Sequence, residues 1–214
     1  MKIIILVRHA TAVDRGIEMP DFDRALIKKG RKESKKMAKV FHDLQIRPGI
    51  WISSPAPRAL ETAEIFADIF QHPVTKILKE EKLYSDNTAM VYMDLIRTIP
   101  DDQNSVIFFG HDPAISDFAA LLLKKFNLSF QKGGVVVITH LSASWQSIEA
   151  GSGFLTTLEF PKKDRSADSL LQDNLQYLFS IHNQQLFSKV YPKYQKKLTK
   201  FLDGTGEKVA KKIR

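Results

Sequence analysis

The stretch Lys2-Ile3-Ile4-Ile5-Leu6-Val7-Arg8-His9 decides how this chain folds. From Ile3 to Val7 it is a continuous apolar run rich in β-branched residues, which is typical of a strand buried on both faces. Shorter runs of the same kind recur at residues 50–52 and 106–109. Strands of this composition occur where helices cover both faces of a parallel sheet.

Each of these apolar runs is followed by a segment whose apolar residues have helical spacing. The three segments are residues 28–44, 58–70 and 115–126. The alternation of strand and helix predicts an α/β fold, a three-layer αβα sandwich with a mostly parallel central sheet and its chemistry at the carboxyl ends of the strands. Two later β-like runs, 135–139 and 154–160, are expected to complete the sheet as an edge hairpin.

The composition is that of a soluble globular protein. Of its 214 residues, 43% are apolar and 26% are charged, and none is cysteine. These values argue against disorder, and no stretch approaches the roughly 20 apolar residues that span a bilayer. The N-terminal apolar run is too short for a signal peptide. We therefore expect a cytoplasmic protein that does not associate with a membrane.

The positive charge is concentrated at the C-terminal end. Residues 1–160 hold 20 Lys and Arg against 19 Asp and Glu, whereas residues 161–214 hold 12 against 5. Apolar residues after Pro161 recur at intervals of three, four or eight, which predicts a C-terminal amphipathic helical extension. We therefore predict a catalytic domain over 1–160 and a basic extension over 161–214. The apolar stripe docks on the domain or on a second subunit, so an oligomer can form through it.

Basic residues and histidines follow three of the predicted strands. The segments are Arg8-His9-Ala10-Thr11, residues 53–58, which end at Arg58, and Gly110-His111-Asp112-Pro113. Because the carboxyl ends of parallel strands converge on one crevice, we expect these side chains to meet. Arginine offers forked donors to phosphate and histidine adds a further donor. The sequence therefore predicts a site for a tetrahedral dianion.

The order and placement of these segments resemble the histidine phosphatase superfamily, also called phosphoglycerate mutase-like. Its Arg-His-Gly signature corresponds to Arg8-His9-Ala10, and its later G-H-x-P element to residues 110–113. Residues 53–63, Ser-Ser-Pro-Ala-Pro-Arg-Ala-Leu-Glu-Thr-Ala, resemble its S-x-x-x-R-A-x-x-T-A element. The short SixA-type phosphohistidine phosphatases are most similar, because this chain lacks a large helical insert and Asp23-Arg24-Ala25-Leu26 resembles part of their R-P-L-T segment. The resemblance covers about residues 1–160.

The resemblance implies a role for each of these residues. His9 is the nucleophile and carries the phosphoryl group until water hydrolyses it. Arg8 and Arg58 hold the non-bridging oxygens, and His111 donates to the same oxygens. Thr11 either adds a hydroxyl to substrate binding or caps its loop. No metal or other cofactor is expected, because these cationic groups do the work of divalent ions, and the partner is a phosphorylated protein or a small phosphocompound.

The sequence departs from the family pattern at the general acid. The mutase-like members carry an L-x-E element, but Leu83-Tyr84-Ser85 places serine at the acidic position. Asp86, Glu81 or Glu80 substitutes by a local shift, or no acid is present. Without an acid, an easily protonated leaving group such as imidazole departs most readily. This favours phosphohistidine over sugar phosphates as the substrate.

Smaller departures and ambiguities affect single positions. Ala10 replaces the usual glycine and raises the prospect of backbone strain, and Ile27 replaces a threonine that would cap the next helix. Asp112 either orients His111 or caps the helix that begins near Pro113, and we favour the cap.

Two other functions remain open. One is a phosphoglycerate mutase-type phosphoryl transferase, which the missing insert and Ser85 disfavour. The other is a non-catalytic phosphate-binding module whose basic tail binds an anionic partner, although nucleic acid is not the partner we expect.

Overall fold

The structure of the protein is a computed structural model that describes residues 1–16, 19–123, 126, 129–162, 166 and 168–170. They belong to a compact unit that spans Met1–Leu175. Within this described part, no helix is long and apolar enough to cross a membrane. The predicted helical extension lies almost entirely outside the described residues, so it and the domain boundary at residue 160 stay predictions.

Six strands form one sheet in the order β3-β2-β4-β1-β5-β6. Their bounds are β1 Lys2–Arg8, β2 Ile50–Ser53, β3 Ile77–Lys79, β4 Ser105–Gly110, β5 Val135–His140 and β6 Phe154–Glu159. Strands β1 to β4 pair in parallel, whereas β5 runs antiparallel to both β1 and β6. The mostly parallel sheet and its edge hairpin are therefore confirmed, and β3 is an additional strand at the opposite edge.

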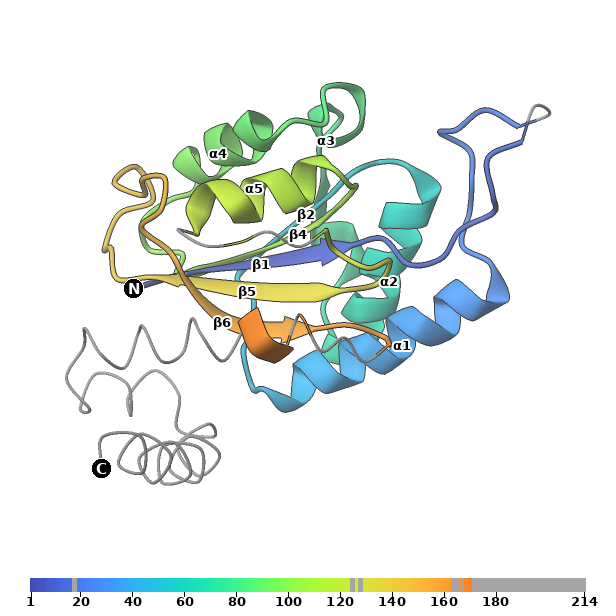
Figure 1. The fold of residues 1–214 in the computed structure, drawn as a ribbon, viewed down its shortest axis with the longest axis horizontal. Coiled ribbons are helices and arrows are strands. Elements are labelled where there is room, and N and C mark those ends of the chain that lie inside the picture. Colours follow the sequence, from blue (N-terminus) through green and yellow to red (C-terminus); the bar gives the residue numbers. More distant parts are fainter. Residues whose placement is uncertain (17–18, 124–125, 127–128, 163–165, 167, 171–214) are drawn as a thin grey trace, which may run out of the picture. The chain divides into compact units, whose positions relative to one another are not determined.

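Helices cover both faces of this sheet, as Figure 1 shows, so the three-layer prediction is confirmed. The α-helices are α1 Lys28–Asp43, α2 Pro57–Phe70, α3 Lys82–Ser85, α4 Ala89–Arg97 and α5 Ala114–Leu122. A 3-10 turn lies at Val74–Lys76. Helices α1 and α2 pack on one face, and α4 and α5 pack on the other. The sequence analysis predicted α1, α2 and α5 but missed α3 and α4.

The strand β1 is buried on both faces because its side chains alternate between two cores. Ile4 and Leu6 pack in the core beneath α4 and α5, whereas Ile5 and Val7 pack in the core beneath α1 and α2. All four side chains are fully buried. Burial of such a side chain stabilises the fold by roughly 1.5 to 3 kcal/mol, so this strand fixes the centre of the sheet.

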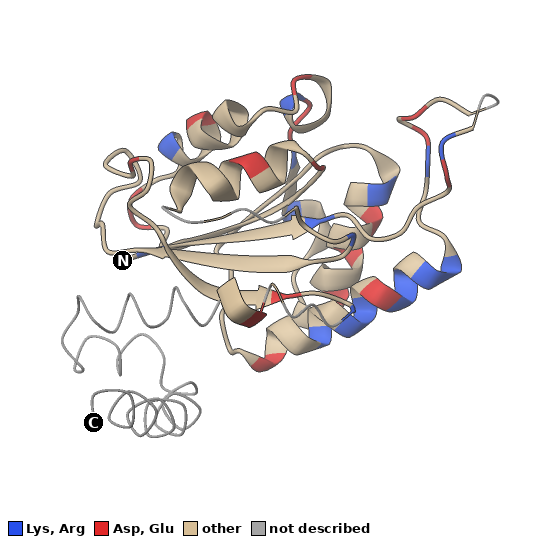
Figure 2. Cartoon of the chain, in the orientation of Figure 1, with Lys and Arg blue, Asp and Glu red and all other residues tan. Residues whose placement is uncertain are grey.

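Helix α1 is amphipathic and carries a concentrated positive charge. Its buried side is apolar, and Met37, Ala38 and Phe41 on this side face the sheet. Lysine and arginine occupy much of its other side, as Figure 2 shows. The helix begins after Ile27, whose side chain makes no capping hydrogen bond, as expected from the missing threonine.

Candidate active site

The backbone of the sheet brings the three predicted segments together. Arg8, the last residue of β1, lies opposite Gly110, the last residue of β4, and β2 pairs with the other side of β4. The ladder continues one residue further, because the His9 amide donates to the Gly110 carbonyl at 3.0 Å. The Ser54 amide donates to the Phe109 carbonyl at 2.9 Å. The first residues beyond β1 and β2, His9 and Ser54, are therefore fixed against β4 by hydrogen bonds.

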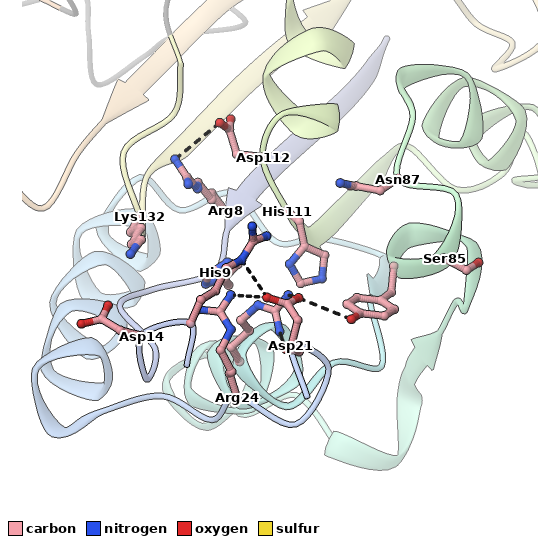
Figure 3. Close-up of a pocket in the computed structure, with 13 residues that line it drawn as sticks. Arg8, His9, Asp14, Asp21, Arg24, Ser85, Asn87, His111, Asp112 and Lys132 are labelled. Atoms are coloured by element: carbon pink, nitrogen blue, oxygen red, sulfur yellow. Dashed lines mark hydrogen bonds and ion pairs between the residues drawn. The ribbon is translucent and has the colours of Figure 1, made fainter. Parts of the chain in front are cut away.

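A cleft of about 530 Å³ opens at this edge of the sheet (Figure 3). Arg8, His9, Arg58 and His111 all line it, so the structure brings these four together. The other lining residues are Asp14, Arg15, Asp21, Arg24, Tyr84, Ser85, Asn87, Asp112 and Lys132.

His9 is held as a neutral ring with one defined nitrogen available. Its Nδ1 lies 2.8 Å from the Ala10 carbonyl oxygen, which only accepts, so Nδ1 carries the proton and Nε2 carries the lone pair. The ring is buried, and burial together with the neighbouring His111 lowers the pKa of His9 to about 3. His9 is therefore uncharged at neutral pH, with a free lone pair on Nε2.

The loop after His9 is unstrained and anchored on both sides. Ala10 is not among the residues with positive φ, so the alanine is accommodated without strain. Its amide donates to Thr62 Oγ1 of α2 at 3.2 Å. Thr11 lies outside the group that lines the cleft, and its hydroxyl donates to Glu33 Oε2 of α1 at 2.6 Å. In this structure Thr11 ties the loop to α1.

His111 is oriented by Ser54, a residue to which the sequence analysis gave no role. His111 Nε2 lies 2.8 Å from Ser54 Oγ, and the rings of His111 and His9 have centroids 5.2 Å apart. Among the described residues, His111 Nδ1 has no hydrogen-bond partner. Burial and the nearby Arg58 lower the pKa of His111 to about 3, so this ring is also neutral at pH 7.

Arg8 is held from the side of α5. Its Nη1 donates to the Phe130 carbonyl and lies 3.7 Å from Asp112 Oδ2. Asp112 does not cap α5, because the N-cap is Pro113 and makes no side-chain hydrogen bond. The Asp112 carboxylate instead accepts from the hydroxyls of Ser116 and Ser129. Our preference for the cap was therefore wrong, and Asp112 pairs with Arg8.

Arg58 is paired with Asp21, which the sequence analysis did not identify. Arg58 Nη2 donates to Asp21 Oδ2 at 2.9 Å, and Nη1 donates to the Asp21 main-chain oxygen at 2.6 Å. Arg24 and Arg15 each lie 3.0 Å from Asp21 Oδ1. Partial burial opposes ionisation of Asp21, but these arginines outweigh it and hold the pKa of its carboxyl below the ordinary value.

The cleft presents more positive charge than its own carboxylates neutralise. Five cationic side chains line it against three carboxylates, which leaves a surplus of two positive charges. Four buried nitrogens around it have no partner among the described residues: Nε of Arg8, Arg24 and Arg58, and Nδ1 of His111. A doubly charged tetrahedral anion fits this charge surplus.

The acids considered from sequence do not line the cleft. Asp86, Glu81 and Glu80 are absent from its lining, which instead contains Ser85 and Asn87 from that region. The carboxylates that do line it are Asp14, Asp21 and Asp112, and the last two are paired with arginine. Within the described parts of the chain, no group of three His, Cys, Asp or Glu side chains is placed to hold a metal ion.

Comparison with known sequences points to one family. Residues 4–84 match the sequence model of the Histidine phosphatase superfamily (branch 1), a region that contains His9 and Arg58. A protein of Picosynechococcus sp. named as uncharacterized is 25% identical over 154 residues, which cover 70% of this chain and 92% of that protein.

Comparison with solved structures gives the same fold. A candidate phosphohistidine phosphatase SixA from Agrobacterium tumefaciens has a TM-score of 0.64 at 22% identity, over 74% of this chain and 97% of that one. The protein histidine phosphatase SixA complexed with tungstate has a TM-score of 0.64 at 20% identity, over the same shares of the two chains. At these identities the likeness concerns the fold. With its sequence match over residues 4–84 and its cleft of two arginines and two histidines, the chain is similar to the histidine phosphatase superfamily and has the fold of the SixA-type members.

Proposed function

We propose that this protein is a phosphatase that removes the phosphoryl group from phosphohistidine through a covalent intermediate on His9. One observation carries the proposal: the Nδ1 proton of His9 is engaged by the Ala10 carbonyl, which leaves the Nε2 lone pair in a cationic cleft. A neutral imidazole beside bound phosphate is a competent nucleophile.

In the first step, Nε2 of His9 attacks phosphorus. A bond forms between Nε2 and phosphorus, and the bond from phosphorus to the substrate nitrogen breaks, so the electron pair leaves with the substrate. Arg8, at the end of β1, and Arg58, in the first turn of α2, line the cleft with His9 and offer charged donors to the non-bridging oxygens. Charge that spreads over these oxygens in the transition state is thereby stabilised.

His111 adds a neutral donor to the same oxygens. If Ser54 donates its hydroxyl proton to His111 Nε2, the ring proton resides on Nδ1, the nitrogen without a partner among the described residues. Ser54 already accepts from the Ala56 amide at 3.3 Å, which leaves its hydroxyl proton free for this role. His111 then stabilises the transition state without carrying a charge.

The state of the carboxylates favours a nitrogen leaving group. Two of the three carboxylates that line the cleft, Asp21 and Asp112, are engaged by arginine and are therefore not free to deliver a proton to a leaving group. An alkoxide leaves slowly without a proton donor, whereas an imidazole is protonated readily by solvent. The cleft is therefore better suited to phosphohistidine than to alkyl phosphates.

In the second step, water attacks the phosphoryl group on His9. The bond from Nε2 to phosphorus breaks, the lone pair returns to Nε2, and inorganic phosphate is released after the water loses a proton to solvent. The likeness to a SixA structure complexed with tungstate supports binding of a tetrahedral oxyanion in this fold.

The test compares three substrates in the presence of a chelator: a chemically phosphorylated histidine peptide, 4-nitrophenyl phosphate and phosphoserine. We expect kcat/KM to decrease in that order and to be unaffected by the chelator. His140→Asn is the control variant, because His140 is buried outside the cleft. Equal rates on phosphohistidine and phosphoserine, or loss of activity with the chelator, would contradict the proposal.

A further inference from the structure

Helix α1 carries a line of lysines on its exposed side. Lys28, Lys32, Lys35 and Lys39 are spaced at i, i+4, i+7 and i+11, which places them along one face of a helix. All four are exposed to solvent. At a rise of 1.5 Å per residue, this lysine row extends for about 16 Å.

The lysine row is not explained by ion pairing within the fold. The other cations of α1 have partners: Lys29 lies 3.9 Å from Glu33, Arg31 lies 2.5 Å from Glu61, and Lys36 donates to the Pro161 carbonyl at 3.0 Å. None of the four row lysines has an ion pair or side-chain hydrogen bond within the described residues. Like charges at i and i+4 destabilise a helix, so the row does not serve the stability of α1.

The row begins beside the candidate active site. Gly30, in the first turn of α1, packs so closely on the loop after His9 that a Cβ there would lie 1.9 Å from the Thr11 carbonyl oxygen. The Thr11 hydroxyl also donates to Glu33 of the same helix. The first turn of α1, where the row starts, therefore lies beside the loop that follows His9.

Two partly exposed apolar residues come next to the row and to the cleft lining in the chain: Ile27 directly precedes Lys28, and Val13 directly precedes Asp14, which lines the cleft. Residues Ala12 and Leu26 pair as a short antiparallel bridge, so Val13 and Ile27 are diagonal neighbours across it. Both side chains are 37% exposed. Protein interfaces combine an apolar centre with a polar rim. Single-stranded nucleic acid is instead held by stacking on aromatic rings, and no exposed large apolar side chain of the described residues is aromatic.

We infer that the lysine row is the docking surface for an acidic face of the protein substrate, which presents its phosphorylated side chain to His9. The inference rests on the proposed function and names its partner: a protein with carboxylates at spacings that match the row. Charge complementarity of this kind raises the association rate and sets the choice of partner.

The test uses the full chain with two charge-reversal variants. The row variant is K32E/K35E/K39E, and the matched control is K76E/K79E/K82E, which makes the same change in charge at three exposed lysines around β3. The probes are two synthetic helical phosphohistidine peptides. One has glutamates at i, i+4, i+7 and i+11, and the other has glutamines at the same positions. Phosphoramidate serves as a substrate too small to reach the row.

We expect the wild-type kcat/KM to be roughly 10-fold higher for the glutamate peptide at low salt, since each exposed pair contributes modestly. The row variant should lose this preference, the control should keep it, and both should hydrolyse phosphoramidate like the wild type. Salt should reduce the preference. An equal kcat/KM for both peptides, or a preference that survives in the row variant, would overturn the inference.

Two further measurements separate this inference from its alternatives and from the proposed function. Binding of the unphosphorylated glutamate peptide, followed by fluorescence anisotropy, tests docking even if no phosphoryl group is transferred. Binding of single-stranded RNA or phosphatidylserine vesicles that the row variant loses, with no loss of peptide binding, would assign the row to those partners and overturn the inference.

Discussion

The cleft has two walls that are built in different ways. The strand-end wall consists of Arg8, His9 and His111, which end or directly follow β1 and β4. The loop wall consists of Arg15, Asp21 and Arg24. Asp21 forms ion pairs with both of these arginines and with Arg58. Both histidines of the first wall are almost fully buried, at 6% and 5% exposure, whereas the Asp21 side chain is 34% exposed.

The difference in burial indicates that the two walls of the cleft suit different functions. Buried groups held by backbone hydrogen bonds keep one geometry, which is what transition-state stabilisation needs. Ion pairs at a partly exposed site stabilise a fixed geometry less than buried hydrogen bonds do. An arginine in such a pair can therefore exchange its carboxylate for a phosphate. Asp21 occupies part of the donor fork of Arg58, so an arriving phosphate competes with this carboxylate. Under the proposed function, the strand-end wall performs the chemistry, and the loop wall adjusts affinity for the anion.

The largest expected effect comes from breaking the strand-end wall. His111→Ala removes a pre-positioned donor and should lower kcat by roughly 10² to 10³-fold, the usual cost of losing one such group. The measurement is steady-state hydrolysis of 4-nitrophenyl phosphate. Ser85→Ala, which also lines the cleft but whose hydroxyl donates to the Glu81 carbonyl, should change kcat by less than about threefold. A similar small effect for His111→Ala would remove the distinction between the walls.

As the pH falls, the groups of the strand-end wall should lower the free energy of unfolding at a higher pH than those of the loop wall. His9 has a folded pKa of about 3, below its unfolded value of about 6.5, so the unfolded state takes up a proton first and stability falls as the pH falls. Between pH 7 and pH 5, protonation of His9 in the unfolded state should lower the free energy of unfolding by about 2 kcal/mol.

Urea denaturation at the two pH values measures this cost, and His9→Asn should reduce the pH-dependent loss by that amount. Asp21→Asn should leave the loss between pH 7 and pH 5 unchanged. The lowered pKa of Asp21 gives stability that disappears only as the pH falls below the ordinary value for aspartate. A loss of stability that is the same in His9→Asn and the wild type would contradict the burial argument.

A moderate effect is expected when the loop wall loses its carboxylate. Asp21→Asn removes the anion that competes for Arg58, so inhibition by inorganic phosphate should strengthen by roughly 3 to 10-fold, as expected for a screened charge at short range. The inhibition constant for phosphate is the quantity to measure. Asp23→Asn makes the same change in charge in the same loop outside the cleft lining and should leave this constant unchanged. Weaker inhibition in Asp21→Asn would show that Asp21 mainly orders the loop.

The smallest effect concerns the tie between the nucleophile loop and α1. Thr11→Val removes the hydrogen bond to Glu33 and should lower the unfolding free energy by about 1 kcal/mol. Activity should change by less than about threefold, because Thr11 does not line the cleft. Thr75→Val at an exposed position is the control. A loss of activity above about 10-fold would show that Thr11 takes part in substrate binding.

The strand-end wall could be predicted from sequence because its positions follow from local pattern. An apolar run marks each strand, and the next residues must lie at the carboxyl edge of a parallel sheet. Arg8, His9 and His111 could therefore be assigned to one cleft without knowledge of any loop. The sheet hairpin and the helices α1, α2 and α5 follow from periodicity in the same way.

The pairing of the loop wall with Arg58 could not be predicted, because it joins residues far apart in the chain. Arg58 meets Asp21 across 37 positions, and no spacing rule connects them. Asp112 was assigned to a cap on local grounds, but its carboxylate contacts Arg8 and Ser129, which are distant from it in the chain. Ser54 was visible in the motif, but its bond to His111 requires the register of β2 against β4.

The most direct test of the account is a search for a phosphoryl group on His9. The protein is reacted briefly with phosphoramidate, quenched in alkali and digested, and the peptide containing His9 is examined by mass spectrometry, with His9→Ala as the control. We predict a phosphorylated peptide that localises to His9, disappears on longer incubation and is absent from the variant. Hydrolysis of phosphoramidate with no label on His9 at any time would contradict the covalent mechanism.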